Sequence, residues 1–325
     1  MQTVQGISLG LRVEPAGQAR ADGGLKRAGQ RLSLVLTLAF LTACGSLQST
    51  KPQEPGAPPV AERREVRLGL ALGGGAARGF AHVGVIQVLE EAGLRPSHVV
   101  GTSAGSLVAA LYASGKTPAE LVRVAESLQE AEITDWMLPI LNRGALRGEA
   151  LAKYVNTQVG GKTMEQMQIP LGIVATDLGN GQAITFRRGN TGAAVRASSA
   201  VPAVFQPVRL GDREYVDGGL VSPVPVRQTR EMGANFVIAV DISSDPEGNP
   251  YGDTFQILMQ TFAIMGKSIN TLALKEADLV IRPALNGIKS ADFSARLRSI
   301  EAGRVAMRAA LPALKARLAQ FEEGR

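Results

Sequence analysis

From Arg67 onward, short apolar runs alternate with longer amphipathic stretches, and no other feature restricts the fold as strongly. The alternation predicts a strand over 66–72, a helix over 79–92, a strand over 97–101 and a helix over 104–114. Thr117-Pro118-Ala119-Glu120 predicts the start of another helix, because it places an N-cap residue, a proline and an acid in the order that helix starts favour. This succession of elements is typical of an α/β fold.

The rest of the chain extends the pattern to the C-terminus. Strands are expected over 170–176, 182–186, 206–210, 213–216 and 235–241, with hairpin turns at Gly179-Asn180-Gly181 and Gly211-Asp212. A helix over 253–274, a short strand over 278–281 and a last helix over 294–319 follow. There is no internal repeat, and no boundary requires a second domain. We therefore expect a single domain over 66–325.

The N-terminal part of the chain has a different character. Residues 32–43 form an apolar run that follows Lys26, Arg27 and Arg31 and ends in small residues, which is typical of a secretory signal peptide. The run is shorter than the roughly 20 apolar residues that cross a membrane; a buried core helix is the alternative. We predict a signal peptide over 1–43. The segment before the apolar run is long for a charged leader, so we expect translation to begin near Leu25 and residues 1–24 not to be made.

Leu41-Thr42-Ala43-Cys44 resembles the lipobox of bacterial lipoproteins, in which the cysteine is lipid-modified and becomes the first residue after cleavage. Cys44 is the single cysteine of the chain. Gly45 in the next position resembles lipoproteins that are sorted to the outer membrane. The resemblance implies a lipid-anchored membrane protein of the bacterial cell envelope, on the periplasmic face of the outer membrane. Residues 44–65 are expected to form a proline-rich tether after the lipidated cysteine.

Composition excludes several classes of function. One cysteine and two histidines, His82 and His98, leave too few ligands for a zinc cluster, and we expect neither a metal nor another cofactor. The chain has 35 Lys and Arg against 29 Asp and Glu, a net charge of +6. Such a charge favours mild attraction to anionic membrane surfaces. Without a basic run or interleaved aromatic residues, it gives no case for nucleic acid as a partner.

The motif Gly101-Thr102-Ser103-Ala104-Gly105 lies where a predicted strand turns directly into an apolar helix. In this setting a G-x-S-x-G pentapeptide favours a nucleophile elbow, with Ser103 as the nucleophile. Gly101 and Gly105 would relieve crowding around a strained serine whose hydroxyl is exposed to substrate. The alternative is a serine that only caps the helix.

The motif Gly73-Gly74-Gly75-Ala76-Ala77-Arg78-Gly79 follows the first predicted strand and opens the first helix. Its N–H groups lack screening by side chains and converge on one spot, which suits negative charge. The glycine spacing does not fit a dinucleotide loop, and no Gly-Lys-Ser/Thr ending marks a Walker loop. We therefore interpret the motif as an oxyanion hole. Arg78 either steadies this loop, meets a phosphate head group, or is a solvated surface residue.

The general base cannot be the histidine of a Ser-His-Asp triad in the α/β-hydrolase order. No histidine follows residue 98, and His82 and His98 are interpreted as packed or surface residues. Asp217-Gly218-Gly219 ends a predicted strand, and the two glycines would let the Asp217 carboxylate approach another loop closely. A carboxylate with a pKa of about 4 is a weak base for a hydroxyl. An Asp217 base therefore depends on short geometry, partial desolvation and the oxyanion donors.

These three motifs, in this order, resemble the patatin-like phospholipase family over residues 67–230. Three further segments support the resemblance: Ala81-His82-Val83-Gly84-Val85, Arg196-Ala197-Ser198-Ser199-Ala200-Val201-Pro202 and Leu220-Val221-Ser222-Pro223-Val224-Pro225. The sequence is most similar to the bacterial branch that resembles the catalytic domain of neuropathy target esterase. The resemblance implies a three-layer α/β/α fold with a mostly parallel central sheet, and a more helical C-terminal part over 250–325.

The resemblance also implies a chemistry and a set of site residues. Ser103 would be the nucleophile and Asp217 the general base of a Ser-Asp dyad that cleaves fatty acyl esters of phospholipids or lysophospholipids through an acyl-enzyme intermediate. The N–H groups of Gly74, Gly75 and Ala76 would form the oxyanion hole. Supporting positions are Gly73, Arg78, Gly79, Gly101, Gly105, Gly218 and Gly219. One departure is that two alanines, Ala76 and Ala77, precede the arginine where the family has one residue. Lipid acyl transfer and non-catalytic lipid binding are the alternatives.

Other candidate residues carry less specific signals. The cluster Trp136-Met137-Leu138-Pro139-Ile140-Leu141 either lines an acyl pocket, dips into lipid as a lid, or is an ordinary buried loop. Ser198 and Ser199 are interpreted as helix or turn residues without a direct catalytic role. Asp177, after the strand over 170–176, is interpreted as a turn or cap residue, with a role in the site left open.

Overall fold

The computed structural model describes residues 64–324 apart from 136–143 and 290. The described residues belong to one compact unit, Pro59–Arg325. The predicted signal peptide, the lipidated Cys44, most of the tether and the Trp136 cluster lie outside the described residues, so they stay predictions.

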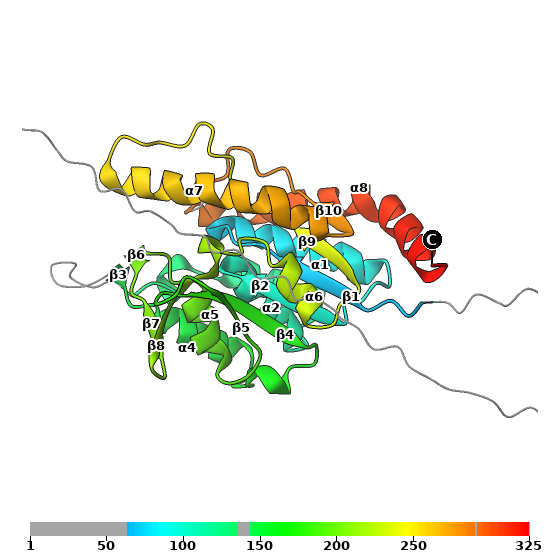
Figure 1. Ribbon diagram of the computed structural model, residues 1–325, viewed down its shortest axis with the longest axis horizontal. Coiled ribbons are helices and arrows are strands. Elements are labelled where there is room, and N and C mark those ends of the chain that lie inside the picture. Colours follow the sequence, from blue (N-terminus) through cyan, green and yellow to red (C-terminus); the bar gives the residue numbers. More distant parts are fainter. Residues whose placement is uncertain (1–63, 136–143, 290, 325) are drawn as a thin grey trace, which may run out of the picture. The chain divides into compact units, whose positions relative to one another are not determined.

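An eight-stranded sheet forms the middle layer, in the order β10-β9-β1-β2-β4-β8-β7, with β5 also paired to β4 (Figure 1). The strands from β10 to β4 run parallel, whereas β5, β8 and β7 are antiparallel to their neighbours. The bounds are β1 Leu68–Leu72, β2 His98–Thr102, β4 Leu171–Asp177, β5 Ala183–Phe186, β7 Val208–Leu210, β8 Arg213–Asp217, β9 Phe236–Val240 and β10 Leu279–Ile281. A separate pair joins β3 (Gly144–Leu146) to β6 (Ala203–Phe205).

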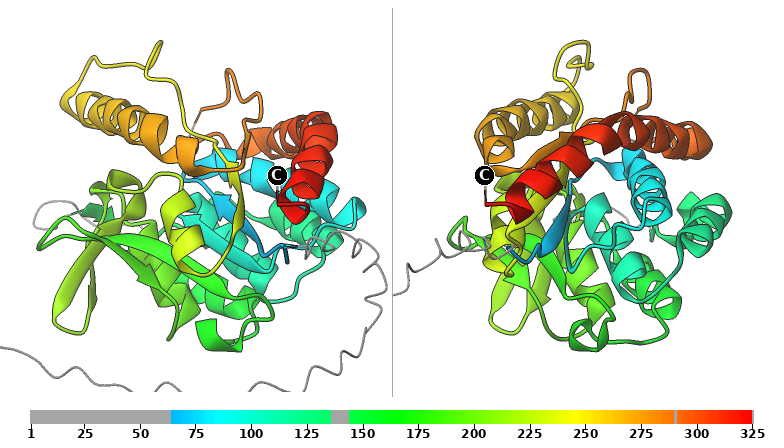
Figure 2. Two further views of the ribbon diagram at one scale, coloured as in Figure 1. Left: turned by 45° about the vertical axis from the view of Figure 1, so that its right-hand side comes forward. Right: turned by 90° about the vertical axis from the view of Figure 1, so that its right-hand side faces the viewer.

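Helices cover both faces of the sheet, as Figures 1 and 2 show. The helices are α1 Phe80–Glu91, α2 Ala104–Ala113, α3 Pro118–Ser127, α4 Glu149–Gln158, α5 Thr191–Ser198, α6 Val226–Glu231, α7 Thr254–Ala273 and α8 Arg296–Glu322. Successive strand residues point to opposite faces: Leu70 packs into the large core with α1, α2 and α8, whereas Ala71 packs into a smaller core with α6. The expected three-layer α/β/α fold with a mostly parallel sheet is confirmed.

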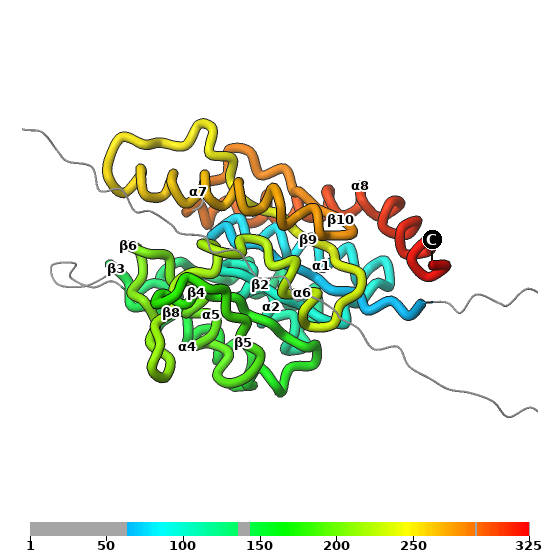
Figure 3. The backbone as a smooth tube through the Cα atoms, viewed as in Figure 1, coloured from blue at the N-terminus to red at the C-terminus, as the bar shows by residue number. Residues whose placement is uncertain are grey.

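The crossing of α8 over α1 shows how tightly the large core is packed. A Cβ atom on Gly84 would lie 2.0 Å from the backbone oxygen of Ile300, and one on Gly303 would lie 2.0 Å from that of Ala81. Only glycine allows the two helix backbones to approach so closely. The crossing places α8 in the same large core as β1. The backbone path of both elements can be followed in Figure 3.

Most predicted elements are present with shifts of one to three residues at their ends, and both predicted hairpins, β4–β5 and β7–β8, are antiparallel pairs. The helix predicted from Thr117 begins there, with a capping box between Thr117 and Glu120. The strand predicted over 206–210 is shorter and begins at Val208, because Pro207 has no N–H to donate to a neighbouring strand. Helices α4, α5 and α6 have no counterpart among the predicted elements.

Candidate active site

Ser103 occupies the turn between β2 and α2, as the elbow motif predicts. Its φ of 52° and ψ of −124° place a non-glycine residue in a strained region of backbone conformation. Although Ser103 holds the N-cap position of α2, its side chain makes no capping hydrogen bond. The hydroxyl is therefore not consumed by the helix end, and the N-cap alternative does not account for it.

The flanking glycines are required by close backbone contacts. A Cβ atom on Gly101 would lie 2.3 Å from the oxygen of Gly105, and one on Gly105 would lie 2.2 Å from the oxygen of Leu72. Both distances are far below any real contact of a Cβ atom. The predicted role of these two glycines as spacers around the serine therefore has a direct geometric basis.

A second serine, Ser198, fixes the backbone of Ser103. The sequence pattern predicts no direct catalytic role for it. Ser198 lies at the end of α5, is fully buried, and accepts a 2.8 Å hydrogen bond from the N–H of Ser103. Its own hydroxyl donates to the oxygen of Val174 on β4 at 2.5 Å. Ser198 thus ties the nucleophile to the neighbouring strand. The only sequence signal for it is its place in a segment that resembles the family.

Asp217, the last residue of β8, is buried and faces the nucleophile. Its Oδ1 accepts a 2.6 Å hydrogen bond from the N–H of Gly219, whereas the buried Oδ2 has no hydrogen-bonding partner of normal geometry among the described residues. Burial raises the pKa of Asp217 to about 6, and the Ser103 side chain and the Gly219 N–H act in the opposite direction. The carboxylate is thus a stronger base than an exposed aspartate, as the predicted desolvation requires.

The sheet register explains how residues so distant in sequence come together. On β4, Val174 lies opposite Thr102 of β2, and the next residue, Ala175, lies opposite Asp217 of β8. Ser103 and Asp217 are therefore level with each other across one intervening strand. A Cβ atom on Gly218 would lie 2.2 Å from the oxygen of Val174 and 3.1 Å from the Thr102 side chain. The turn after Asp217 consequently crosses tightly over β4 toward the elbow.

The glycine-rich loop lies against the nucleophile and is held at several backbone atoms. A Cβ atom on Gly74 would lie 3.1 Å from the Cβ of Ser103. The N–H of Gly73 donates to the oxygen of Val240, and the N–H of Gly74 donates to the oxygen of Pro223 at 2.9 Å. Among the described residues, no partner accepts from the N–H of Gly75 or Ala76. Of the three N–H groups predicted to form an oxyanion hole, that of Gly74 is already hydrogen-bonded, whereas those of Gly75 and Ala76 have no acceptor among the described residues.

The extra alanine is accommodated by the backbone of the loop. Ala76 has a φ of +50°, in the left-handed region, and begins a short 3-10 turn over Ala76–Gly79. The 3-10 turn leads directly into α1, which starts at Phe80. A left-handed alanine costs about 1–2 kcal/mol.

Arg78 and His82 steady this loop from inside the protein. Arg78 is 7% exposed and its Nε donates to the oxygen of Gly75 at 3.4 Å, so the interpretation as a solvated surface residue is wrong. His82 is fully buried, and burial lowers its pKa to about 4. The neutral ring donates through Nε2 to the oxygen of Gly73 at 2.8 Å. His98 is only half-buried at the start of β2, near the Ser97 hydroxyl.

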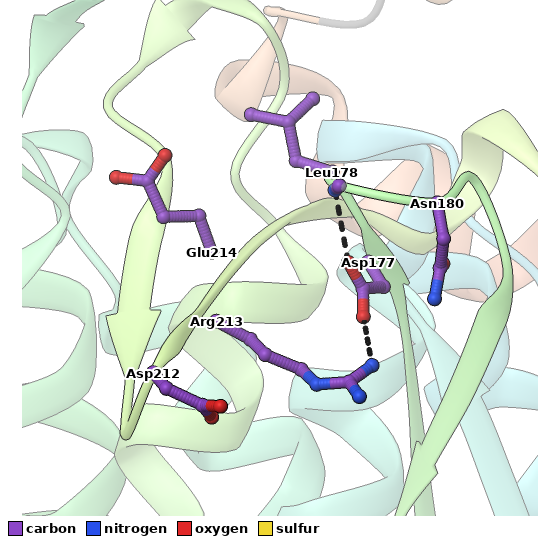
Figure 4. A pocket seen from close by; sticks show the side chains of 7 residues that line it. Asp177, Leu178, Asn180, Asp212, Arg213 and Glu214 are labelled. Carbon is purple, nitrogen blue, oxygen red and sulfur yellow. Dashed lines mark hydrogen bonds and ion pairs between the residues drawn. The ribbon is translucent and has the colours of Figure 1, made fainter.

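Asp177 belongs to a separate polar cavity of about 510 Å³ beside the β4–β5 and β7–β8 turns (Figure 4). Its Oδ1 accepts from the N–H of Gly179 at 2.9 Å, and its Oδ2 pairs with Arg213 at 2.6 Å. The Arg213 hydrogen bond is the main reason why the pKa of Asp177 is lowered. The interpretation of Asp177 as a turn residue is confirmed by this arrangement.

The fold and the candidate site define an α/β protein with a strained serine at a strand-to-helix turn, a glycine-rich loop beside it and a buried aspartate as the third element. Residues 70–230 match the family model of the patatin-like phospholipases, and this part of the chain belongs to that family. The family resemblance predicted from the three motifs is thus confirmed.

Individual relatives agree with this assignment. The chain is 37% identical over 195 residues to an uncharacterised NTE family protein of Mycobacterium tuberculosis, covering 60% of this chain and 54% of that protein. It is 31% identical over 196 residues to patatin-like phospholipase domain-containing protein 6 of Mus musculus, covering 58% of this chain and 14% of that protein. This chain thus spans about half the length of the mycobacterial relative. Among solved structures, VipD from Legionella pneumophila has a similar fold, with a TM-score of 0.53 and 15% identity over 77% of this chain and 68% of VipD.

Proposed function

We propose that this protein is a serine acyl hydrolase that cleaves fatty acyl esters of phospholipids or lysophospholipids through a Ser-Asp dyad. One observation carries the proposal: the Asp217 carboxylate is buried, its pKa is raised to about 6, and the side chain of the strained Ser103 acts on it by hydrogen bonding. The patatin-like phospholipase family of residues 70–230 supports lipid esters as the substrate class.

The geometry supports a two-step mechanism. As Ser103 Oγ attacks the acyl carbonyl, its proton passes to Asp217 Oδ2. The tetrahedral alkoxide is stabilised by the N–H groups of Gly75 and Ala76, which have no other partner among the described residues. Collapse of this intermediate breaks the ester bond. The lysolipid or alcohol leaves with the proton held by Asp217, and the fatty acyl chain stays on Ser103.

Deacylation repeats the chemistry with water as the nucleophile. Asp217, again ionised, accepts a proton from the water as it attacks the acyl carbonyl, and the same two N–H groups stabilise the second alkoxide. When that intermediate collapses, the proton returns from Asp217 to Ser103 Oγ and a fatty acid is released. The dyad is thereby restored for another cycle.

We further propose that the protein acts while anchored to a membrane of the bacterial cell envelope, on the periplasmic face of the outer membrane, through a lipid on Cys44. The signal pattern over 32–43 and the lipobox-like residues before Cys44 support this proposal. Mass spectrometry of the wild type should find a lipid on Cys44, and a Cys44→Ala variant should lack it. An unmodified Cys44 in membrane fractions would contradict the anchor.

Product analysis tests the hydrolase proposal. The full-length protein is mixed with a lysophospholipid, or with a phospholipid, and the released fatty acid is measured beside Ser103→Ala and Asp217→Asn as matched inactive variants. Fatty acid release by the wild type alone is expected. If the acyl chain instead appears on an added lipid alcohol, the protein is an acyltransferase. If no acyl group moves in any substrate, the lipid-binding alternative replaces the enzyme.

A further inference from the structure

Helix α7 is the least buried long element of the described chain. Its 20 residues, Thr254–Ala273, bury only Gly266 and Asn270. The stretch Thr254–Glu276 is long and apolar enough to cross a membrane by length and composition, yet little of it is buried within the protein. A helix that is apolar on most sides is normally a core element, so α7 requires another explanation.

The N-terminal half of α7 extends past the edge of the sheet that carries the site. Strands β9 and β10 are parallel neighbours, so α7 must return from the carboxyl ends of the strands to their amino ends. A helix of 20 residues is about 30 Å long, whereas a five-residue strand such as β9 spans about 16 Å. Gly266 is the first buried residue of α7, and it lies beside Pro223, whose oxygen accepts from the Gly74 N–H. Residues 254–265 consequently project beyond the carboxyl edge, where Ser103 lies.

The projecting half exposes large apolar side chains on more than one side of the helix. Phe255, Ile257, Ile264 and Met265 are exposed by 50%, 55%, 51% and 46%. Ile257, Ile264 and Met265 follow the i, i+7, i+8 spacing of one face, whereas Phe255 points to a different face. No residue over 254–265 is buried. Another protein molecule would cover one face of the helix, whereas lipid chains can surround several faces at once.

The charges of α7 also suit a membrane surface. The helix contains one charged residue, Lys267, and no carboxylate. Lys267 pairs with Asp245 at 3.0 Å. Residues 254–265 contain no charged side chain, so their insertion into lipid desolvates none. The N-cap carboxylate of Asp253 accepts a hydrogen bond from the Gln256 N–H at 2.8 Å. Residues 254–265 are too few to cross a bilayer, which takes about 20 apolar residues. Their apolar side chains suit shallow burial at the boundary between head groups and acyl chains, like the apolar face of an interfacial helix, although they lack the basic polar face of such helices.

We propose that residues 254–265 of α7 insert into the surface of a lipid bilayer and hold the catalytic edge of the sheet against the membrane. This inference rests on the proposed function, because such docking brings the dyad to esters that reside in lipid. It assigns a contact to the catalytic domain that is independent of the predicted lipid anchor on Cys44.

A site-specific fluorescence experiment tests the contact. The full-length protein carries Trp136→Phe, which removes the single tryptophan, and Ser103→Ala, which prevents lipid turnover. The reporter variant adds Ile264→Trp, and the matched control variant adds Val305→Trp on α8, where the native side chain is 57% exposed. Vesicles of phosphatidylcholine and phosphatidylglycerol with a doxyl label on the acyl chains are then added. We expect the tryptophan emission of the reporter variant to shift to shorter wavelength and to be quenched, and that of the control variant to stay unchanged.

Other results would overturn the proposal. If vesicles leave the emission of the reporter variant unchanged, α7 does not enter lipid, even where the N-terminus binds the vesicle. If the emission of this variant shifts with protein concentration in the absence of vesicles, a second copy of the chain covers α7 instead. Equal quenching in the reporter and control variants would show that the contact is not specific to α7.

A kinetic experiment separates docking from catalysis. In the active enzyme, Ile257→Glu together with Ile264→Glu should lower hydrolysis of vesicle lipid at least about tenfold, which equals about 1.4 kcal/mol. The same variant should hydrolyse a soluble short-chain ester within about twofold of the wild type, and Val305→Glu should change neither rate. Equal loss on both substrates would contradict docking. If the wild type hydrolyses neither ester, the proposed function fails, while the fluorescence result still decides whether α7 binds lipid.

Discussion

The two halves of the candidate dyad are prepared by different physical means. On the serine side, the backbone is strained at Ser103, crowded at Gly101 and Gly105, and fixed by the Ser198 hydroxyl. On the aspartate side, the side chain is buried, one carboxylate oxygen lacks a hydrogen-bonding partner among the described residues, and the pKa of Asp217 is raised to about 6. In the proposed dyad, backbone geometry would expose the Ser103 hydroxyl, whereas burial would make Asp217 a stronger base.

This difference suggests how a carboxylate can replace a histidine. An ordinary aspartate has too low a pKa to accept a proton from a hydroxyl efficiently, and burial corrects part of that mismatch. The correction costs stability, because a buried carboxylate is unfavourable when ionised. At Ser103 the unfavourable free energy comes instead from the strained backbone conformation. Substitutions on the two sides should therefore have different consequences for stability as well as for rate.

The largest effect is expected for the nucleophile itself. Ser103→Ala should lower the kcat for ester hydrolysis by about 10⁶-fold, because no acyl-enzyme can form. The side chain makes no capping hydrogen bond, so the melting temperature should change little. Ester hydrolysis and circular dichroism melting measure the two quantities. Residual activity within about a hundredfold of the wild type would assign the nucleophile elsewhere.

The next effect belongs to the base. Asp217→Asn should lower kcat by about 10⁴-fold, as removal of the charge on a catalytic carboxylate does in other serine enzymes. Its Oδ1 can still accept from the Gly219 N–H, so the turn should keep its shape. Steady-state kinetics measure this, with Asp177→Asn as a matched control at a buried carboxylate outside the dyad. A comparable fall in kcat for Asp177→Asn would contradict the assignment of Asp217 as the general base.

The raised pKa of Asp217 sets the pH dependence of both rate and stability. Since the ionised form is the base, kcat/KM should fall about tenfold per pH unit below about pH 6. The folded-state pKa lies above the ordinary value of 3.8, so the folded protein binds the proton more tightly and ionisation is destabilising. The stability of the wild type relative to Asp217→Asn should therefore fall by about 3 kcal/mol as pH rises from about 4 to about 6.

Denaturant titrations of the two proteins at several pH values measure this difference. An unchanged gap between them from pH 4 to pH 7 would show that Asp217 is not desolvated in the folded protein.

A smaller effect is expected where the serine is fixed to β4. Ser198→Ala removes the acceptor of the Ser103 N–H, and we expect kcat to fall about tenfold with little change in KM, because the nucleophile is misplaced while the binding surface is kept. Ser199→Ala is the matched control, since no side-chain hydrogen bond of Ser199 is found in the described part of the chain. Equal kcat values for the two variants would show that Ser198 does not position Ser103 for catalysis.

The smallest effect concerns the strain at the elbow. Ser103→Gly should be more stable than Ser103→Ala by about 1 kcal/mol, because glycine adopts a positive φ without the steric cost that alanine meets. Both variants are inactive, so the comparison isolates backbone strain from chemistry. Equal melting curves would mean that the elbow is not strained in solution.

The sequence identifies candidate site residues more readily than it predicts the packing around them. Ser103 and Asp217 can be found because each stands in a glycine-rich motif at the end of a strand, where few other residues meet the local requirements. The order of strands in the sheet carries no local signal, so the crossing of the Asp217 turn over β4 cannot be read in advance. Ser198 could not be predicted for the same reason, because its partners, Ser103 after β2 and Val174 on β4, are brought to it by tertiary packing.

The helices show the same limit. The short α5 contains threonine, glycine and serine, and its apolar residues Ala194, Val195 and Ala197 show no clear period, yet packing against the sheet makes it helical. Conversely, α7 is predicted by its apolar composition, but the same composition gives no warning that most of it is unburied. Composition predicts that a segment is helical and does not predict what covers it.

Covalent labelling tests the central assignment most directly. The full-length protein is treated with a fluorophosphonate, and the modified residue is mapped by peptide mass spectrometry, with and without excess lysophospholipid. We predict a single adduct on Ser103, slowed by lysophospholipid, strongly reduced in Asp217→Asn and absent from Ser103→Ala. An adduct on another residue, or an unlabelled Ser103 in a protein that still hydrolyses lipid esters, would contradict the account.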